Sequence, residues 1–369
     1  MNVLVLSGHT GGHLFPCIGF SENLKLSFPQ SRITLITSEK ARPFLQGKFT
    51  DLFETTHFLP SFPSPSGISL SWFLFTKKLF DAFSRTSRIL NQMKPDVCIG
   101  FGSYVSYPGI VLAHRRKIPT LIHEQNARPG RATSWLVPHA DIIATSFPDT
   151  FPNIPASKVF HVGLPLKTHI LQTGGWRSKV MTTDPHCLRL LVMGGSQGAH
   201  WINKTVVQAL SELSDEEKDK LVVNHIAGKQ DWNEVRCAYE KVKIRAQVFS
   251  FFDRMDEIFL NTDFAISRAG ANTLFELSYF GIPALLIPYP YAGGHQLLNA
   301  RFFENRSAAW CAQERDLVPG LVLEKIRLLM RSFSALEPMA DKMRSLAMPD
   351  AGCGLVKLAR QLAGFKYDQ

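Results

Sequence analysis

The feature that most restricts the fold of this chain occurs twice: a short apolar run enters a glycine-rich turn, and an amphipathic segment follows. In the first half, Val3–Leu6 leads into Gly8–His13 (GHTGGH). In the second half, Leu188–Met193 leads into Gly194–Gly198 (GGSQG). A buried strand, a tight turn and a helix in this order begin a doubly wound α/β domain. The repetition predicts two such domains in tandem within the 369 residues.

Apolar or β-branched runs alternate with helical periodicity along the chain, which is typical of parallel sheets covered by helices on both faces. The strands expected in the first half are Val3–Leu6, Ile33–Thr37, Val97–Ile99, Thr120–Ile122 and Ile142–Ala144. Those expected in the second half are Leu188–Met193, Val222–Ile226, Gln247–Phe249, Phe264–Ile266 and Ala284–Ile287. A helical stripe follows at Ile202, Val206, Leu210 and Leu213. We expect an N-terminal domain over residues 1–163, a C-terminal domain over 164–340, and a helical segment over 341–369 that packs back on the N-terminal domain.

Charge and cysteine usage narrow the classes of partner. The chain has 41 Lys and Arg against 31 Asp and Glu, a net charge of +10, so an anionic partner is expected: a phosphate-bearing substrate, an acidic membrane surface or a nucleic acid. The six cysteines stand singly, which disfavours a disulfide framework or a zinc ribbon and suits a reducing cytosol. No stretch reaches the roughly 20 apolar residues of a membrane span, and no signal-peptide pattern is present, so secretion is not expected.

A candidate diphosphate site follows the expected strand Phe264–Ile266. Its sequence, Ser267–Glu276 (SRAGANTLFE), brings small residues to the start of a helix, where exposed backbone N–H groups and the helix dipole favour a diphosphate. Glu276 lies at least one turn into that helix, where a carboxylate can accept hydrogen bonds from both hydroxyls of a ribose. A capped helix with Glu276 facing solvent is the alternative. The later polar turn Gly293–Asn299 (GGHQLLN) favours the nucleotide site.

Several familiar patterns are missing from the sequence. Neither glycine-rich turn reads G-x-G-x-x-G, which disfavours a dehydrogenase. There is no D-x-D pair, P-loop or H-E-x-x-H motif, and the histidines are not spaced as ligands within one element. We therefore expect no metal and no cofactor, so that helix dipoles and cations such as Lys167 would neutralise a bound diphosphate.

Polar side chains gather after another expected strand, in Ile122–Asn126 (IHEQN). The carboxyl ends of parallel strands are where ligands bind in open α/β sheets, although a plain surface loop remains the alternative. Before it, Gly100–Gly109 (GFGSYVSYPG) is a further glycine-rich turn from strand to helix.

The segment Leu70–Leu90 has more apolar surface than one core-facing stripe needs. On a helical wheel one face carries Trp72, Phe75, Leu79, Ala82, Phe83 and Leu90. Phe73 and Phe80 project from another side, flanked by Lys77 and Arg88. Aromatic side chains beside cations suit insertion at an anionic membrane surface, so Trp72, Phe73, Lys77 and Phe80 are candidate membrane contacts. Cover by a neighbouring loop is the alternative.

Four motifs in order give the chain a resemblance to a known family. Gly8–His13, His123–Asn126 (HEQN), Gly194–Ala199 and Ser267–Glu276 look like the MurG family, the UDP-N-acetylglucosamine–undecaprenyl-pyrophosphoryl-N-acetylmuramoyl-pentapeptide transferases of bacterial cell-wall synthesis. The resemblance runs from residue 2 to about residue 310. It implies a GT-B glycosyltransferase fold, in which two Rossmann-like domains face a cleft and the C-terminal one holds most of the donor nucleotide.

The resemblance also implies a reaction and a location. GlcNAc would pass from UDP-GlcNAc to the C4 hydroxyl of the muramoyl sugar of lipid I, with inversion and without a metal, to give lipid II for peptidoglycan. The enzyme would be peripheral, on the cytoplasmic face of the bacterial plasma (inner) membrane, with an anionic membrane surface as a partner and no nucleic acid. Other proteins of cell-wall synthesis are candidate partners.

Particular residues match the family's motifs. His13 is the candidate general base, because an imidazole titrates near neutrality; Glu124 is the alternative base, and a purely loop-orienting His13 remains open. Tyr104 and Glu124 are expected on the acceptor side. Glu276 is expected to bind the ribose and the backbone of Phe252 the uracil. UDP-GlcNAc contacts are implied for Thr10, Gly11, Gly12, Asn126, Lys167, Ser196, Gln197, Phe252, Ala271, Asn272, Thr273, Leu274, Phe275, Glu276, His295 and Gln296.

The chain departs from the family pattern at a few positions. His9 and Tyr107 stand where glycine is usual, Leu164 replaces an asparagine, and Lys167 replaces an arginine, which exchanges a bidentate contact for a point charge. These departures put acceptor details and donor affinity in question. The rival functions are a UDP-sugar transferase to another lipid such as diacylglycerol, a UDP-GlcNAc epimerase, and a non-enzymatic nucleotide or nucleic-acid binder, which would bind DNA or RNA with a strong salt dependence.

Overall fold

The structure is a computed structural model that describes residues 1–45, 49, 51–60, 71–178, 187–195 and 199–365; the side chains of residues 71–75, 177, 292 and 333 are outside this description. The chain divides into two compact units. Unit 1 comprises residues 1–168 and 348–369, and unit 2 comprises residues 169–347. These divisions stand a few residues beyond the expected domain limits at 163 and 340. The C-terminal segment is shared, because residues 341–347 belong to unit 2 and the rest belong to unit 1.

Unit 1 contains a seven-stranded, fully parallel sheet. Its strands, in spatial order, are β3 (Thr55–Leu59), β2 (Arg32–Ser38), β1 (Asn2–Leu6), β4 (Val97–Gly100), β5 (Thr120–Glu124), β6 (Ile142–Thr145) and β7 (Val159–His161). Its helices are α1 (Gly11–Ser27), α2 (Arg42–Leu45), α3 (Ser71–Met93), α4 (Ser106–Arg115), α5 (Arg131–Leu136) and α15 (Ala351–Leu362), with 3-10 turns at Glu39–Ala41 and Val137–His139.

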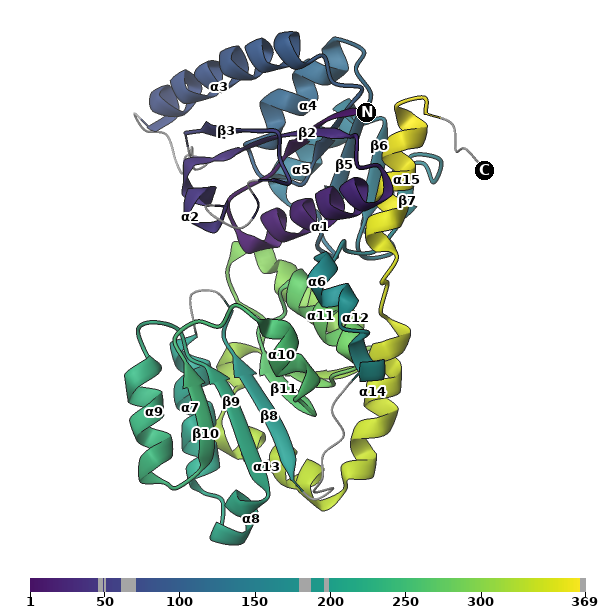
Figure 1. Ribbon diagram of the computed structural model, residues 1–369. Coiled ribbons are helices and arrows are strands. Elements are labelled where there is room, and N and C mark those ends of the chain that lie inside the picture. The colour runs from purple at the N-terminus through teal and green to yellow at the C-terminus, as the bar shows by residue number, and fades with distance from the viewer. Residues whose placement is uncertain (46–48, 50, 61–70, 179–186, 196–198, 366–369) are drawn as a thin grey trace. The chain divides into compact units, whose positions relative to one another are not determined.

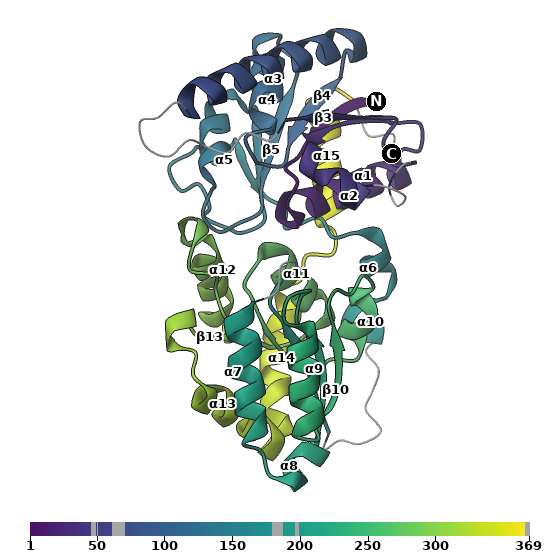
Figure 2. The same ribbon diagram turned by 90° about the vertical axis from the view of Figure 1, so that its left-hand side faces the viewer.

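The central strand β1 is buried on both faces. Val3 and Val5 pack into one hydrophobic cluster with α1 and α15, whereas Leu4 and Leu6 pack into another with α3, α4 and α5. Successive side chains of a strand point to opposite faces, so a continuous apolar run fits a sheet that is covered on both sides. Figure 1 shows α15, in yellow, beside α1, in purple. In Figures 1 and 2, α3 lies alongside α4.

Unit 2 repeats the plan with a six-stranded parallel sheet. Its strands, in spatial order, are β10 (Arg245–Phe249), β9 (Leu221–Ile226), β8 (Leu188–Met193), β11 (Phe264–Ser267), β12 (Ala284–Leu286) and β13 (Ala309–Cys311). Its helices are α6 (Thr168–Gln172, starting at the division between the units), α7 (His200–Ser211), α8 (Asp215–Asp219), α9 (Trp232–Lys241), α10 (Met255–Leu260), α11 (Ala271–Phe280), α12 (His295–Glu304), α13 (Pro319–Arg331) and α14 (Leu336–Ser345). Further 3-10 turns span Gly175–Ser178, Ala292–Gly294, Glu314–Asp316 and Phe333–Ala335.

The core of unit 2 contains the helical stripe that the sequence predicts. Ile202, Val206 and Leu210 of α7 are fully buried and pack with β8 and with α13. Figure 2 shows α7 and α9 on the near side of this sheet.

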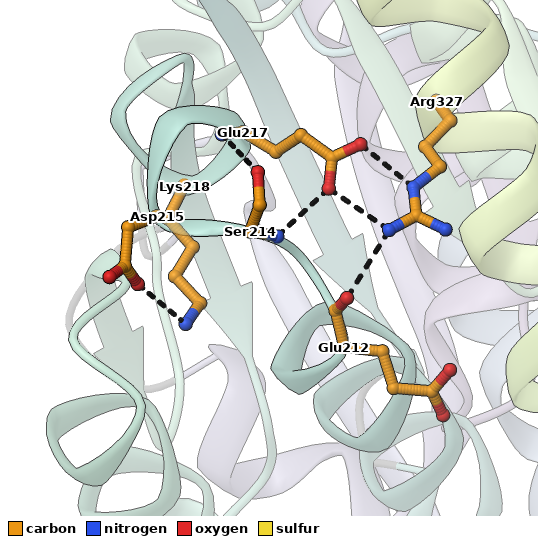
Figure 3. A network of polar contacts seen from close by, with 6 residues as sticks. All are labelled: Glu212, Ser214, Asp215, Glu217, Lys218 and Arg327. Atoms are coloured by element: carbon orange, nitrogen blue, oxygen red, sulfur yellow. Dashed lines mark hydrogen bonds and ion pairs between the residues drawn. The ribbon is translucent and has the colours of Figure 1, made fainter.

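A polar network fastens the short helix α8 to α13 (Figure 3). The Ser214 hydroxyl accepts a hydrogen bond from the backbone N–H of Glu217 at 3.2 Å, and the Glu217 carboxylate accepts one from the backbone N–H of Ser214 at 2.9 Å. Arg327 of α13 donates to both carboxylate oxygens of Glu217, at 2.8 and 3.0 Å. This bidentate contact lowers the pKa of Glu217 and joins a capping box to a neighbouring helix.

The expected fold class is confirmed, because two doubly wound parallel-sheet domains form and each expected strand lies in one of them. Three strands were not expected: β3, β7 and β13. All three lie at a sheet edge and are only partly buried. An edge strand needs no continuous apolar run, so its sequence carries a weaker signal.

Candidate active site

The first glycine-rich turn, and Gly194 and Gly195 at the start of the second, follow strands at which the strand order of each sheet reverses. In unit 1 this point is between β1 and β4, and in unit 2 it is between β8 and β11. Ligands of open α/β sheets bind outside the carboxyl ends of the strands at such switch points. The two sequence halves therefore carry their motifs at the places where this fold binds ligands.

His13 lies in the first turn of α1, at the switch point of unit 1. Its ring packs beside Gly102, which follows β4 with φ of +79°, and a Cβ at Gly102 would stand 3.0 Å from both Nδ1 and Cε1 of the ring. A side chain at Gly102 would therefore be strained and would collide with His13. Nδ1 of His13 lies 2.9 Å from Oε1 of Gln125.

Thr10, Gly11 and Gly12 form the N-terminus of the same helix. Thr10 is the N-cap residue but makes no side-chain cap, and no acidic residue lies in the first turn. Thr10 and Gly12 are exposed. The positive end of the helix dipole is thus not offset by a carboxylate of its own turn, an arrangement that favours an anion.

Glu124 ends β5 and is 1% exposed. One carboxylate oxygen accepts hydrogen bonds from the backbone N–H of Asn126 at 3.0 Å and from its side-chain amide at 3.1 Å. The other accepts one from the backbone N–H of Gly130 at 3.2 Å. Glu124 therefore holds the half-buried Asn126 and the loop that follows it in place.

Tyr104 belongs to an aromatic group that the sequence did not indicate as a whole. Its ring centroid lies 5.6 Å from that of Trp135, and Tyr107 lies 6.1 Å from Trp135 and 6.1 Å from Phe83. Trp135 on α5 is 49% exposed. A tryptophan within a short helix after a strand is a weak signal in the sequence, and only the fold places it against Tyr104.

Lys167 and the aromatic segment are the remaining candidates in unit 1. The ammonium of Lys167 stands 4.6 Å from the ring centroid of Phe15, and the side chain is half-buried. On α3, Lys77 is exposed and Phe80 is 78% exposed, whereas Ala82 and Leu90 are buried. The side chains of Trp72 and Phe73 lie outside the described residues.

In unit 2, α11 begins at Ala271 at the switch point. Its N-cap, Gly270, supplies no side-chain cap, and its first turn contains no acidic residue, so Asn272 and Thr273 lie in a turn that favours an anion. Glu276 is half-buried in the second turn. Leu274 and Phe275 are buried in the core, which leaves only their backbone for a ligand.

Gln296 organises the turn before α11. Its side-chain oxygen accepts hydrogen bonds from the backbone N–H groups of Ala269 at 3.1 Å and Tyr289 at 3.0 Å. His295, the first residue of α12, is half-buried after Gly293 and Gly294, which have φ of +74° and +73°. The side-chain amide nitrogen of Gln296 can only donate hydrogen bonds, so a ligand group that contacts it must be an acceptor.

Phe252 is half-buried after β10, with its ring centroid 4.7 Å from that of Phe249. Ser196 and Gln197 lie outside the described residues.

Within the described part of the chain, no three His, Cys, Asp or Glu side chains gather in a way that could hold a metal ion. No helix of that part has both the length and the apolar character to cross a membrane.

Family models match both halves of the chain. Residues 3–145 match the glycosyltransferase family 28 N-terminal domain, and residues 189–352 match the glycosyltransferase family 28 C-terminal domain. A solved structure of a UDP-N-acetylglucosamine 2-epimerase is 14% identical with a TM-score of 0.69 and covers 100% of this chain and 98% of its own, a likeness of fold alone.

Full-length relatives have higher identity. UDP-N-acetylglucosamine–N-acetylmuramyl-(pentapeptide) pyrophosphoryl-undecaprenol N-acetylglucosamine transferases from Thermodesulfovibrio yellowstonii and Oenococcus oeni are 32% and 33% identical, covering 98% of this chain in both cases and 99% and 97% of their own. The crystal structure of MurG from Acinetobacter baumannii is 26% identical with a TM-score of 0.77, covering 98% of this chain and 100% of its own. With this identity over nearly the whole of both chains, and with the HEQN and SRAGA motifs at the strand ends where such a fold binds ligands, the chain belongs to the MurG family of N-acetylglucosamine transferases.

Proposed function

We propose that this protein transfers GlcNAc from UDP-GlcNAc to the C4 hydroxyl of the muramoyl sugar of lipid I, with inversion, to give lipid II for peptidoglycan. The observation that carries the proposal is the full-length match to transferases whose names state this donor and acceptor. The epimerase likeness is far lower in identity, so a UDP-GlcNAc epimerase is the weaker alternative.

Unit 2 binds the donor in this proposal. The N-terminus of α11, from Ala271 to Thr273, receives the diphosphate, and Glu276 accepts hydrogen bonds from the ribose hydroxyls. Gln296 directs its amide N–H groups to the phosphates or the sugar, together with His295. The backbone of Phe252 reads the uracil. As the bond from C1 of GlcNAc to the diphosphate breaks, negative charge grows on the UDP that leaves, and a fixed helix dipole stabilises that charge.

Unit 1 supplies the acceptor chemistry. His13 takes the proton from the C4 hydroxyl of the acceptor. The hydroxyl oxygen attacks C1 of GlcNAc as UDP leaves, and this single displacement inverts the anomeric centre. Tyr104 contacts the acceptor, and Asn126, held by Glu124, meets the hydroxyls of GlcNAc. Lys167 and the N-terminus of α1 add positive charge for the diphosphate.

The protein acts as a peripheral enzyme of the cytoplasmic face of the bacterial plasma membrane in this proposal. The exposed Phe80 beside Lys77, on a chain with a net charge of +10, supports contact with an anionic membrane surface. Such a surface and the lipid-linked acceptor account for the positive charge without a nucleic acid. Other proteins of cell-wall synthesis remain candidate partners.

The experiment follows label from UDP-GlcNAc into a lipid I analogue, with EDTA present. Parallel reactions omit the acceptor or replace it with diacylglycerol. Labelled product that requires the lipid I analogue supports the proposal. Turnover of the donor without any acceptor identifies an epimerase, and transfer to diacylglycerol alone identifies the other lipid acceptor. Donor binding without any reaction refutes the proposed acceptor while leaving the donor site intact.

A further inference from the structure

A chain of hydrogen bonds through the interior of unit 1 ends at His13. Gln125 and His123, which lie between His13 and the backbone of Gly163, are 1% and 0% exposed. Nε2 of His123 lies 2.9 Å from the Gly163 carbonyl oxygen, and Nδ1 of His123 lies 3.0 Å from the amide nitrogen of Gln125. The Gln125 oxygen lies 2.9 Å from Nδ1 of His13.

The far end of this chain determines where each proton lies. A carbonyl oxygen only accepts hydrogen bonds. Nε2 of His123 therefore carries a proton and donates a hydrogen bond to the carbonyl oxygen of Gly163. Burial lowers the pKa of His123 to about 4, which keeps the ring neutral at pH 7 and leaves a lone pair on Nδ1. Only glycine fits at position 163, since its φ is +89° and a Cβ there would stand 2.7 Å from the Cβ of Met348.

The orientation of the Gln125 amide follows from its neighbours. Its nitrogen lies 2.9 Å from the backbone carbonyl oxygen of His123 as well as 3.0 Å from Nδ1 of that residue. Both positions accept hydrogen bonds, so the NH₂ group faces them and uses its two protons there. The amide oxygen is then directed at His13, where it accepts a hydrogen bond from Nδ1–H.

From this geometry we propose that Gln125 and His123 are positioning residues that hold His13 in the Nδ1–H tautomer, with the lone pair on Nε2. The inference rests on the proposed function, in which His13 is the general base. A neutral imidazole has one basic nitrogen, and only the tautomer with a free Nε2 lone pair can accept the acceptor's proton at Nε2. Among the residues that the structure describes, none makes a hydrogen bond to Nε2 of His13. Gly102 and Gly8 leave room for the ring at the orientation that Gln125 selects.

The direct test is the tautomer of His13 in the full-length protein, measured by long-range ¹H–¹⁵N NMR after labelling of the histidines with ¹⁵N. The signals of His13 are those lost in His13→Ala. We expect a protonated Nδ1 and an unprotonated Nε2 at neutral pH. In Gln125→Leu, the Nε2–H tautomer should become populated. A wild-type His13 with its proton on Nε2, or an unchanged tautomer in Gln125→Leu, would overturn the proposal.

Steady-state kinetics provides a second readout. Gln125→Leu should lower kcat by about tenfold or more, with the KM for UDP-GlcNAc within about twofold, because the base loses its orientation while the donor site is untouched. Gln30→Leu, at an exposed glutamine of the same unit, is the matched control and should leave both constants unchanged. A normal kcat in a folded Gln125→Leu contradicts the proposal.

Two variants of His123 separate orientation from packing. His123→Asn keeps an amide oxygen near the place of Nδ1, which can still accept from Gln125, whereas His123→Phe removes the acceptor and keeps the ring. We expect kcat to stay within about threefold of wild type in the first and to fall about tenfold or more in the second. Equal losses in both variants would indicate a packing role.

The failure of the inference differs from the failure of the proposed function. If His13→Ala retains a wild-type kcat, the base role is refuted, and the NMR experiment still decides whether Gln125 sets the tautomer. If His13→Ala loses activity but Gln125→Leu changes neither the tautomer nor kcat, His13 remains the general base. The positioning role of Gln125 and His123 is then refuted.

Discussion

Glu124 holds Asn126 through two hydrogen bonds to one carboxylate oxygen, from the backbone N–H at 3.0 Å and from the side-chain amide at 3.1 Å. The second oxygen accepts from Gly130. A general base needs a lone pair accessible to the substrate, whereas both oxygens of Glu124 accept hydrogen bonds from its own loop and the residue is 1% exposed. The arrangement favours His13 as the base and Glu124 as the residue that orients Asn126.

Replacement of Glu124 by glutamine therefore tests the division of roles. The amide oxygen can still accept from Asn126, but the NH₂ group then faces the N–H of Gly130, so the loop is disturbed. We expect the KM for UDP-GlcNAc to rise about tenfold, equivalent to roughly 1.4 kcal/mol, with a smaller effect on kcat. By contrast, His13→Ala should lower kcat by roughly 100-fold or more. A fall of that size in Glu124→Gln at unchanged KM would make Glu124 the base.

Gln296 connects two turns of unit 2, because its oxygen accepts from the backbone of both Ala269 and Tyr289. Gln296→Leu should weaken UDP binding by about tenfold or more, since two backbone donors lose their acceptor and the turn before α11 loosens. Isothermal titration calorimetry with UDP measures the effect. The control is Gln208→Leu, at an exposed position of the same unit. An unchanged Kd in Gln296→Leu would exclude this turn from the donor site.

Two buried histidines make the stability of the protein depend on pH. Burial lowers the pKa of His123 in unit 1 to about 4 and that of His225 in unit 2 to about 3, from an ordinary value of 6.5. The unfolded chain therefore binds protons that the folded chain does not. This contribution to the free energy of unfolding is fully present above pH 6.5. It decreases as the pH falls toward these lower pKa values, by on the order of 3 kcal/mol for His123 and 5 kcal/mol for His225.

Urea unfolding at pH 7 and at pH 5 measures this dependence. We expect a lower midpoint at pH 5 for the wild type. His225→Gln should lower the midpoint at both pH values and narrow the difference between them. His114→Gln, at an exposed histidine that contributes only to the lowered pKa of His139, should change that difference far less. Equal midpoints for the wild type at the two pH values would contradict the assignment of both rings as buried and neutral.

Variants at Phe80 and Lys77 test whether this part of α3 contacts a membrane surface. Phe80 is 78% exposed, so its replacement costs the fold little, and the double variant Phe80→Ser with Lys77→Glu reverses a charge where anionic lipid is expected. Binding to phosphatidylglycerol vesicles should fall by at least about tenfold, while kcat on a water-soluble acceptor analogue should be unchanged. Leu26→Ser, at a leucine of unit 1 that is 67% exposed, is the control. Undiminished vesicle binding by the double variant would locate membrane contact elsewhere.

Periodicity in the sequence predicts the central strands well and the edge strands poorly. Val3–Leu6 is an uninterrupted apolar run because all four side chains are buried, on alternating faces of the sheet. Such a run predicts a central strand. Thr55–Leu59 carries no such pattern, since β3 pairs on one side only and its residues are mostly half-exposed. The same local order of strand, glycine-rich turn and helix predicts that ligands bind at the strand ends.

The sequence by itself determined the doubly wound fold class, the start of a helix at Ala271 and the polar run His123–Asn126. Tertiary structure decided which of these groups meet. β1 pairs with β4, far along the chain, so Gly102 lies against His13, and β5 brings Gln125 within 2.9 Å of the same ring. Local propensity contains no information on such contacts, because they arise from the order in which strands pair and bury their two faces.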